Sequence, residues 1–313
     1  MEDACRQRLT YSARPGASWP GRSGKGCALA ISGTTRLVGI IGWPVEHSLS
    51  PALHNAAFAA YGLDMAYVPL PVPPGAVSTA VAGLQALGFV GANVTIPHKT
   101  AVVPLLAEVD GEARLAGAVN TIVVRDGRLE GYNTDVQGFA RALHDVYPGS
   151  LAGQAVLLLG AGGMARAAAL VLAREGALVT VTDRTPAAAE RIVRVIAQVP
   201  GSAPGETLAL AALSAETVRA ADVIVNASAL GMASVGKVPA VLADNVGSDH
   251  VVCDVVYAKQ PTQLVAQARA REALTVDGLS MLIWQAAASF ELWTGQRAPV
   301  EVMRSAVTGH RGR

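Results

Sequence analysis

The chain has 313 residues, of which 51% are hydrophobic, and its formal net charge at pH 7 is +1. With 4% aromatic residues and no excess of basic charge, it lacks the features that bind nucleic acid, so we expect no nucleic-acid partner. A chain of this length buries a large core and is expected to form two domains that bind small molecules. The isolated Cys5, Cys27 and Cys253 fit neither a disulfide framework nor a zinc site, and we expect no metal.

The first residues carry basic side chains but no apolar block of signal-peptide length. No apolar run in the chain approaches the roughly 20 residues that span a bilayer. We therefore predict a disordered extension over residues 1–35, a cytoplasmic protein and no membrane partner. An Arg-rich organellar transit peptide is the alternative, and Glu2 and Asp3 argue against it.

From residue 36 onward, apolar runs alternate with helical patterns, beginning with the strand LVGIIG. A helix is predicted over residues 51–61, because Ser50 can cap its free amides and Pro51 suits the first helical position. Further strands are predicted at 66–72 and 89–97, helices at 77–87 and 101–110, a hairpin over 118–133 and a helix from 134. The alternation predicts a mostly parallel sheet covered by helices.

A second alternating series begins at Gln154. Its predicted strands are 155–160, 178–183, 207–213, 222–228 and 250–257, and its predicted helices are 164–174, 186–198, 214–221 and 261–272. The last apolar helices, 281–294 and 300–305, have no new strand to cover and are expected to pack back on the first domain. The fold class is thus α/β with two domains. We predict a substrate-binding domain over 36–134, completed by 281–313, a Rossmann-type domain over 135–280, and a cleft between them.

Gly160, Gly162 and Gly163 follow an apolar strand and precede a helix, which is the context of a dinucleotide-binding loop. Glycines there let backbone amides approach a pyrophosphate at the helix N-terminus. A plain strand-to-helix turn and a methyltransferase loop are the alternatives. In the next strand, Asp183 suits a free ribose 2′-hydroxyl, whereas Arg184 suits a 2′-phosphate, so the two residues favour different cofactors.

Two charged residues lie in motifs that are otherwise almost uncharged. NVTIPHK is predicted to deliver Lys99 to a cleft, and GYNTDVQG places Asp135 at a helix start. An ammonium held by a carboxylate can pass a proton to an alkoxide, which makes the two residues a candidate acid–base pair. Two structural alternatives stay open: Lys99 as a surface lysine, and Asp135 as part of a first turn capped by a Thr134–Gln137 capping box.

The chain resembles the shikimate dehydrogenase family over about residues 36–295. The motifs that carry this resemblance, in order, are GWPVEHSLSPALHN, GANVTIPHK, GAVNT, GYNTDVQG, GAGGMARA, NASALGM, DVVY, and DGLSMLIWQ with the following FELWTG. Several independent motifs in the family's order are far more specific than any one of them.

The resemblance implies reversible, NADPH-dependent reduction of 3-dehydroshikimate to shikimate, a reaction of chorismate and aromatic amino-acid biosynthesis. By motif position, Lys99 and Asp135 match the catalytic pair. The residues on or beside substrate-binding positions are Ser48, Ser50, Thr95, Asn120, Asn133, Tyr257 and Gln285. The residues matched to cofactor binding are Gly160, Ala161, Gly162, Gly163, Asp183, Arg184, Thr185, Asn226, Val255 and Gly278.

Three departures from the family's pattern lie toward the cofactor. Asp183-Arg184-Thr185 replaces Asn-Arg-Thr, Tyr257-Ala258-Lys259 replaces Tyr-x-Pro, and Ser280 replaces a glycine. The expected cofactor is therefore NADP(H), with NAD(H) as a possible secondary cofactor. A quinate or aminoshikimate dehydrogenase, and a non-catalytic nucleotide- or metabolite-binding protein, stay open as alternatives. Monomer and homodimer are both compatible with the sequence.

Overall fold

The computed structural model describes residues 31–232, 235–257 and 260–308. Most of the extension predicted over 1–35 therefore lies outside the described residues, as do Ala258 and Lys259. Within the described part of the chain, no helix is both long enough and apolar enough to cross a bilayer.

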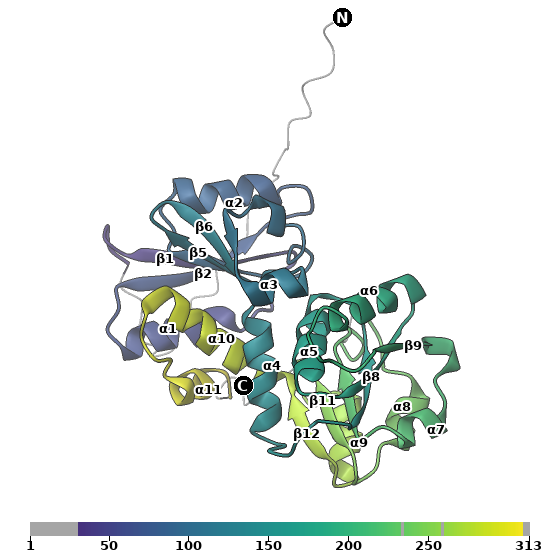
Figure 1. The fold of residues 1–313 in the computed structure, drawn as a ribbon. Helices are drawn as coiled ribbons and strands as arrows, with labels where there is room; N and C mark the ends of the chain where they lie inside the picture. Colours follow the sequence, from purple (N-terminus) through teal and green to yellow (C-terminus); the bar gives the residue numbers. More distant parts are fainter. Residues whose placement is uncertain (1–30, 233–234, 258–259, 309–313) are drawn as a thin grey trace, which may run out of the picture. The chain divides into compact units, whose positions relative to one another are not determined.

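The first half of the chain forms a six-stranded sheet in the order β2-β1-β3-β5-β6-β4 (Figure 1). β1, β2 and β3 are parallel, β4 is parallel to β6, and β5 is antiparallel to both of its neighbours, so the predicted hairpin is present. The strands are β1 Arg36–Gly42, β2 Met65–Pro71, β3 Gly91–Val94, β4 Glu108–Val109, β5 Thr121–Arg125 and β6 Arg128–Tyr132.

Helices cover both faces of this sheet because side chains of β1 alternate between them. Val38 and Ile40 pack into a core with α1 (Ser50–Ala60), whereas Ile41 packs into a second core with α2 (Val77–Ala86) and α3 (Gly111–Ala116). The C-terminal helices α10 (Gly278–Thr294) and α11 (Val300–Thr308) belong to the core of α1. The end of the chain thus packs against the sheet with which the described chain begins.

The second sheet is fully parallel, in the order β12-β11-β10-β7-β8-β9. Its strands are β7 Ala155–Leu159, β8 Leu178–Asp183, β9 Glu206–Ala209, β10 Val223–Asn226, β11 Val251–Asp254 and β12 Leu274–Asp277. Read from the other edge this is the 3-2-1-4-5-6 order of a Rossmann sheet, with the reversal of strand order between β7 and β10. The predicted fold class is confirmed.

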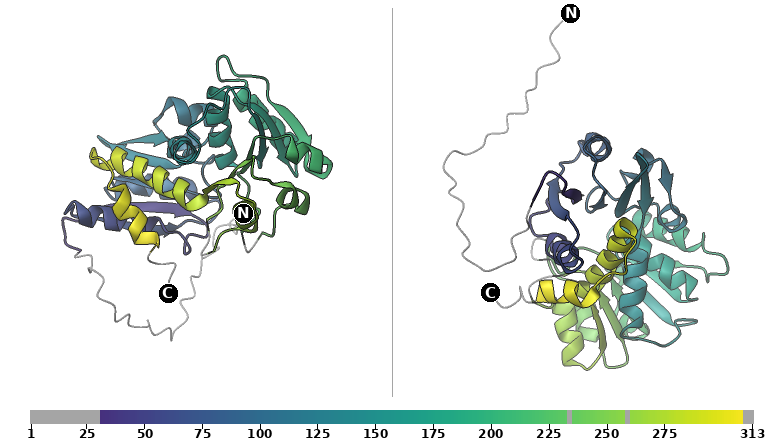
Figure 2. Two further views of the ribbon diagram at one scale, coloured as in Figure 1. Left: turned by 90° about the horizontal axis from the view of Figure 1, so that it is seen from below. Right: turned by 90° about the vertical axis from the view of Figure 1, so that its left-hand side faces the viewer.

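Helices cover both faces of this second sheet. On one face the core contains α5 (Gly163–Arg174) and α6 (Pro186–Ile196), and on the other it contains α7 (Ala215–Arg219), α8 (Ala240–Asn245) and α9 (Gln263–Ala270). The linking helix α4 (Thr134–His144) contributes Val136 and Phe139 to the first of these cores and also packs along α10. Figures 1 and 2 show α4 and α10 side by side.

Several local predictions were wrong. Residues 101–110 form a 3₁₀ turn, Val103–Leu105, and the two-residue strand β4 rather than a helix. Pro104 explains this, because it donates no amide hydrogen bond and disfavours helical geometry in the residue before it. The sequence interpretation also missed β12, α3 and α8, which have only four to six residues. Segments that short carry too little periodicity to identify.

Candidate active site

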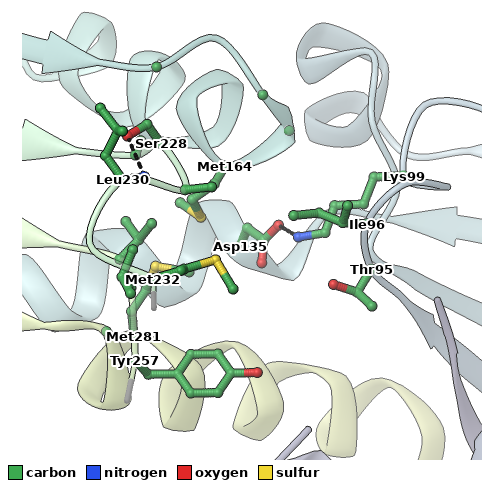
Figure 3. Close-up of a pocket in the computed structure, with 18 of the residues that line it drawn as sticks. Thr95, Ile96, Lys99, Asp135, Met164, Ser228, Leu230, Met232, Tyr257 and Met281 are labelled. Atoms are coloured by element: carbon green, nitrogen blue, oxygen red, sulfur yellow. Dashed lines mark hydrogen bonds and ion pairs between the residues drawn. The ribbon is translucent and has the colours of Figure 1, made fainter. Parts of the chain in front are cut away.

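A cavity of about 440 Å³ lies where the carboxyl ends of β3 and β7 meet residues of α4 and α10. It opens at the switch point of the second sheet, the place where open α/β sheets bind their ligands. Figure 3 shows its lining, with Lys99 and Thr95 facing Met164, Met232 and Met281 across the space. The cavity therefore combines one polar wall with a largely apolar one.

Lys99 and Asp135 form an ion pair in this cavity, with Lys99 Nζ 2.6 Å from Asp135 Oδ2. The Lys99 side chain is 18% exposed and that of Asp135 is 4% exposed, so the carboxylate is almost fully buried and the ammonium retains some access to solvent. Asn120 Nδ2 donates to the other carboxylate oxygen at 2.9 Å. The two predicted residues meet, and the surface-lysine alternative is wrong.

The capping box predicted for Thr134 and Gln137 is also wrong. Asn133 is the N-cap of α4, and its Oδ1 accepts from the amide of Asp135 at 3.2 Å. Asp135 does lie in the first turn of α4, and its carboxylate pairs with Lys99. Asn133 does not line the cavity, and its Nδ2 donates to the carbonyl of Ala118.

The residues matched to substrate binding gather near this pair. Ser50, Thr95, Asn120, Tyr257 and Gln285 all line the cavity. Ser48 instead lines an adjoining pocket of about 120 Å³, and its Oγ accepts from the amide of Ser50. The sequence predicted Ser50 as the cap of α1, and this prediction is wrong. Ser50 is the first residue of the helix, and Leu49 is its N-cap.

Burial changes the acidity of the tyrosines on this wall. Burial raises the pKa of Tyr257, and a hydrogen bond with Ser48 opposes the shift. Tyr67 is deeper, and burial raises the pKa of its hydroxyl well above 10. That hydroxyl donates to Asn93 Oδ1 at 2.7 Å, which holds the Asn93 amide at the cavity wall.

The glycine loop follows β7 and begins α5. Gly160 has a φ of +104°, and a Cβ there would lie 2.8 Å from the amide nitrogen of Ser228, so only glycine fits. A Cβ on Gly162 would meet nothing within 4 Å, which leaves the start of α5 open to the cavity. A Cβ on Gly163 would lie 3.1 Å from Lys99 Cδ. The loop is therefore in direct reach of the ion pair.

Asp183 and Arg184 both line the cavity at the end of β8. Asp183 Oδ1 accepts from the amide of Thr185 at 2.9 Å and closes the turn into α6. Thr185 is the N-cap of α6 but makes no side-chain capping bond, and it does not line the cavity. One Asp183 oxygen is therefore engaged in the turn, and the Arg184 side chain is exposed.

Asn226 lies beneath the cavity wall rather than in it. Its Nδ2 donates to Asp254 Oδ1 at 2.9 Å and to the Leu230 carbonyl at 2.8 Å, while Ser228 Oγ donates to its Oδ1. Thr262 Oγ1 also donates to Asp254, at 2.6 Å. Asn226 and Asp254 thereby fix the loops that present Ser228 and Val255 to the cavity.

Asp254 is 1% exposed, and burial raises its pKa to about 6, although hydrogen bonds from Thr262, Val256 and Asn226 lower it. The sequence interpretation did not single out this residue, nor the cavity residues Asn93, Ser228 and Met232. Asn93 and Ser228 belong to the motifs NVTIPHK and NASALGM, which was the available signal. Among the described residues, no cluster of three or more His, Cys, Asp or Glu side chains is placed to hold a metal.

A Rossmann sheet has a glycine loop at its switch point, and this loop shares a cavity with a Lys–Asp pair formed between the first sheet and the linking helix α4. This arrangement is that of a two-domain nucleotide-dependent oxidoreductase. The profile of the shikimate dehydrogenase substrate binding domain matches residues 40–122, that of shikimate / quinate 5-dehydrogenase matches 142–281, and that of the shikimate 5′-dehydrogenase C-terminal domain matches 278–308. The chain belongs to the shikimate dehydrogenase family.

Individual relatives agree with this assignment. The NADP-dependent shikimate dehydrogenase of Methanopyrus kandleri is 44% identical over 286 residues, which cover 90% of this chain and 98% of that protein. A shikimate dehydrogenase crystallised with NADP+ superposes with a TM-score of 0.84 at 38% identity, covering 91% of this chain and 98% of its own. The quinate dehydrogenase of Corynebacterium glutamicum with NAD gives 0.80 at 34% identity, covering 88% and 99%.

The raised pKa of Asp254 predicts a specific pH dependence of stability. A carboxyl whose pKa rises from 3.8 to about 6 on folding stabilises the fold fully below pH 4, and that contribution is lost as the pH rises through 6. The free energy of unfolding of the wild type, minus that of Asp254→Asn, should therefore increase between pH 7 and pH 4. The increase should be on the order of 3 kcal/mol, measured by urea denaturation.

Asp249→Asn is the matched control, because Asp249 is an exposed carboxylate next to the same strand. Its pH profile of stability should run parallel to that of the wild type. If the unfolding free energies of Asp254→Asn and the wild type changed with pH in parallel, the Asp254 carboxyl would have the same pKa in the folded and unfolded chains, which would contradict the prediction.

Proposed function

We propose that this protein catalyses the reversible, NADP-dependent interconversion of shikimate and 3-dehydroshikimate. The observation that carries the proposal is that the glycine loop and Lys99, whose ammonium is paired with the buried Asp135, line the same cavity. This arrangement puts an acid–base pair beside a dinucleotide site, as an alcohol dehydrogenation requires. The names of the relatives supply the substrate, and the oxidoreductase class and the use of NADP follow from the family.

When bound, NADP(H) supplies or accepts the hydride. Lys99 donates a proton to the oxygen of the substrate carbonyl during reduction, and takes it back from the hydroxyl during oxidation. Asp135 keeps the Lys99 side chain oriented through the ion pair between Nζ and Oδ2. Asn120, which donates to the far oxygen of Asp135, prevents that carboxylate from rotating away from Lys99.

We assign substrate recognition to the polar wall of the cavity, in a domain of residues 36–134 completed by the C-terminal helices. Hydroxyls and amides suit a ring that carries several hydroxyl groups, because they both donate and accept. The proposed contacts come from Ser50, Thr95, Asn120 and Gln285, with Ser48 from the adjoining pocket. Tyr257 adds a contact from the other domain, after β11. Asn133 supports this wall by capping α4 and holding the Ala118 carbonyl.

The residues of the second sheet fit a dinucleotide. The open start of α5, with Gly162 as its N-cap, offers free amides to a pyrophosphate, and Asp183 and Arg184 lie at the end of β8. We assign NADP binding to residues 135–280, with Gly160, Ala161, Gly163, Val255 and Gly278 in the wall and Asn226 and Thr185 behind it. A cytoplasmic location and a monomeric or homodimeric state stay predictions.

The test of this proposal is the initial rate of NADP reduction with saturating shikimate. Parallel assays use quinate as the substrate and NAD as the cofactor. We expect the shikimate rate with NADP to exceed the rates with quinate, and substrate-free protein to show no reduction. A higher rate with quinate would reassign the protein within its family, and no rate with any pair would leave a binding protein and contradict the proposal.

Lys99→Ala should lower kcat for shikimate oxidation by about a hundred- to ten-thousand-fold, which is the usual contribution of general acid–base catalysis. The KM for shikimate should change much less, because the ammonium acts mainly on the proton that moves. Steady-state kinetics with NADP measure both. Lys237→Ala is the control, since Lys237 is exposed and does not line the cavity. An unchanged kcat for Lys99→Ala would remove Lys99 from the chemistry.

Asp183→Asn should raise the preference for NADP over NAD by about ten-fold, because one negative charge near the expected 2′-phosphate is worth roughly 1 kcal/mol or more. Asparagine keeps the Oδ1 acceptor that closes the turn with the Thr185 amide. The measured quantity is the ratio of kcat/KM for NADP to that for NAD. The control is Glu190→Gln, which removes an exposed charge from α6 and should leave this ratio at the wild-type value. A wild-type ratio for Asp183→Asn would mean that Asp183 does not face the ribose.

A further inference from the structure

Three buried hydroxyls meet behind the cavity, one each from β5, α4 and α10. Ser289 Oγ lies 2.8 Å from Thr121 Oγ1 and 3.0 Å from Thr134 Oγ1, and the two threonine oxygens are 3.2 Å apart. The three residues are at most 1% exposed. Asn93 Nδ2 donates to Ser289 Oγ at 3.0 Å, so Ser289 also touches the side chain that lines the cavity from β3. The proposed reaction does not use any of these three hydroxyls directly.

These hydroxyls are one side chain away from the catalytic pair. Asn120 Oδ1 accepts from the amide of Thr134 at 2.7 Å and lies 3.1 Å from the hydroxyls of both Thr121 and Thr134. Its Nδ2 donates to Asp135 Oδ1. Whatever fixes the Asn120 amide therefore fixes the direction of the Asp135 carboxylate.

Counting protons shows what Ser289 adds. Each hydroxyl has one proton to donate, and the available non-hydroxyl acceptors are Asn120 Oδ1 and the Gln285 carbonyl, which lies 3.0 Å from Ser289 Oγ. When Ser289 donates to that carbonyl, one threonine donates to Asn120 Oδ1 and the other donates to Ser289. Without the serine oxygen, that second threonine must either share Asn120 Oδ1 or donate to the other threonine at 3.2 Å, which is longer than either distance to Ser289. A buried donor thus loses its best acceptor.

Packing alone does not require a serine at this position. Ser289 follows Ala286, Ala287 and Ala288 on α10, and an alanine would have nearly the same volume. A buried hydroxyl is unfavourable unless it is hydrogen-bonded, so the serine is justified by its partners. A different hydrogen bond attaches α10 to the first sheet. One turn after Ser289, Trp293 Nε1 donates to the Ile122 carbonyl at 3.0 Å.

We propose that Ser289 is a positioning residue for the reaction, which holds the Asp135 carboxylate toward Lys99 through Thr121, Thr134 and Asn120. The inference rests on the proposed function, because it presumes that the Lys99–Asp135 pair transfers the proton. It gives α10 a second part in the site, since Gln285 of the same helix already lines the cavity.

Ser289→Ala should lower kcat for shikimate oxidation about three- to ten-fold, the range expected for one buried hydrogen bond, while the KM for shikimate stays within about two-fold. Trp293→Phe is the matched control, because it removes a buried hydrogen bond from the same helix outside the hydroxyl cluster. It should lower the thermal midpoint and leave kcat within about two-fold of the wild type. A purely structural Ser289 would behave like this control.

A double-mutant cycle supplies the decisive readout. If Ser289 acts through Asp135, Ser289→Ala should cause no further loss of kcat in an Asp135→Asn background. Additive losses, a defect in KM alone, or a wild-type kcat for Ser289→Ala would each overturn the inference and leave the proposed function standing. A wild-type enzyme without shikimate activity would instead overturn the proposed function and the inference with it.

Thr121→Val provides a second variant if Ser289→Ala does not fold, which the thermal midpoint would show. Valine has the shape of threonine and removes the hydroxyl that lies closest to Ser289. The same fall in kcat, with the same lack of effect in the Asp135→Asn background, supports the proposal. A wild-type kcat in a folded Thr121→Val variant contradicts it.

Discussion

The burial of the Asp135 carboxylate is the constraint on which the rest of the site depends. A carboxylate that is 4% exposed is costly unless each of its oxygens is paired. Lys99 Nζ and Asn120 Nδ2 pair one oxygen each, and they come from the turn after β3 and from the residue before β5. The end of the first sheet must therefore lie against the start of α4. The same arrangement puts the Lys99 side chain in the cavity that the glycine loop of the second sheet also lines.

The C-terminal helix α10 connects these parts because residues four apart lie on one helix face. Gln285 lines the cavity, Ser289 joins the buried hydroxyls, and Trp293 bonds the Ile122 carbonyl of β5. One face of a single helix thus serves the ligand wall, the polar network behind it and the sheet. These contacts tie α10, which follows directly on β12, to the first sheet.

How far the sequence predicted the site depended on the kind of signal. Lys99 and Asp135 stood out as charges in motifs that are otherwise almost uncharged, and the family resemblance favoured catalysis over the structural alternatives. Alternating apolar runs predicted both sheets. Pro104 was overlooked as a helix breaker, and Asn133 took the capping role given to Thr134. Ser289 carried no signal, since a serine after three alanines is ordinary in a helix. Its side-chain partners are 155 to 196 residues away in the chain, and only the folded structure brings them together.

The conflict between Asp183 and Arg184 takes a different form once the turn is visible. Asp183 Oδ1 accepts from the Thr185 amide, a bond that asparagine makes equally well, so the shape of this turn does not require a carboxylate. What distinguishes aspartate here is only its charge. That charge opposes a 2′-phosphate, while the exposed Arg184 attracts it, and neither residue is held by the Lys99–Asp135 pair. We therefore propose that cofactor preference in this chain depends on electrostatics at the end of β8, independently of the Lys99–Asp135 geometry.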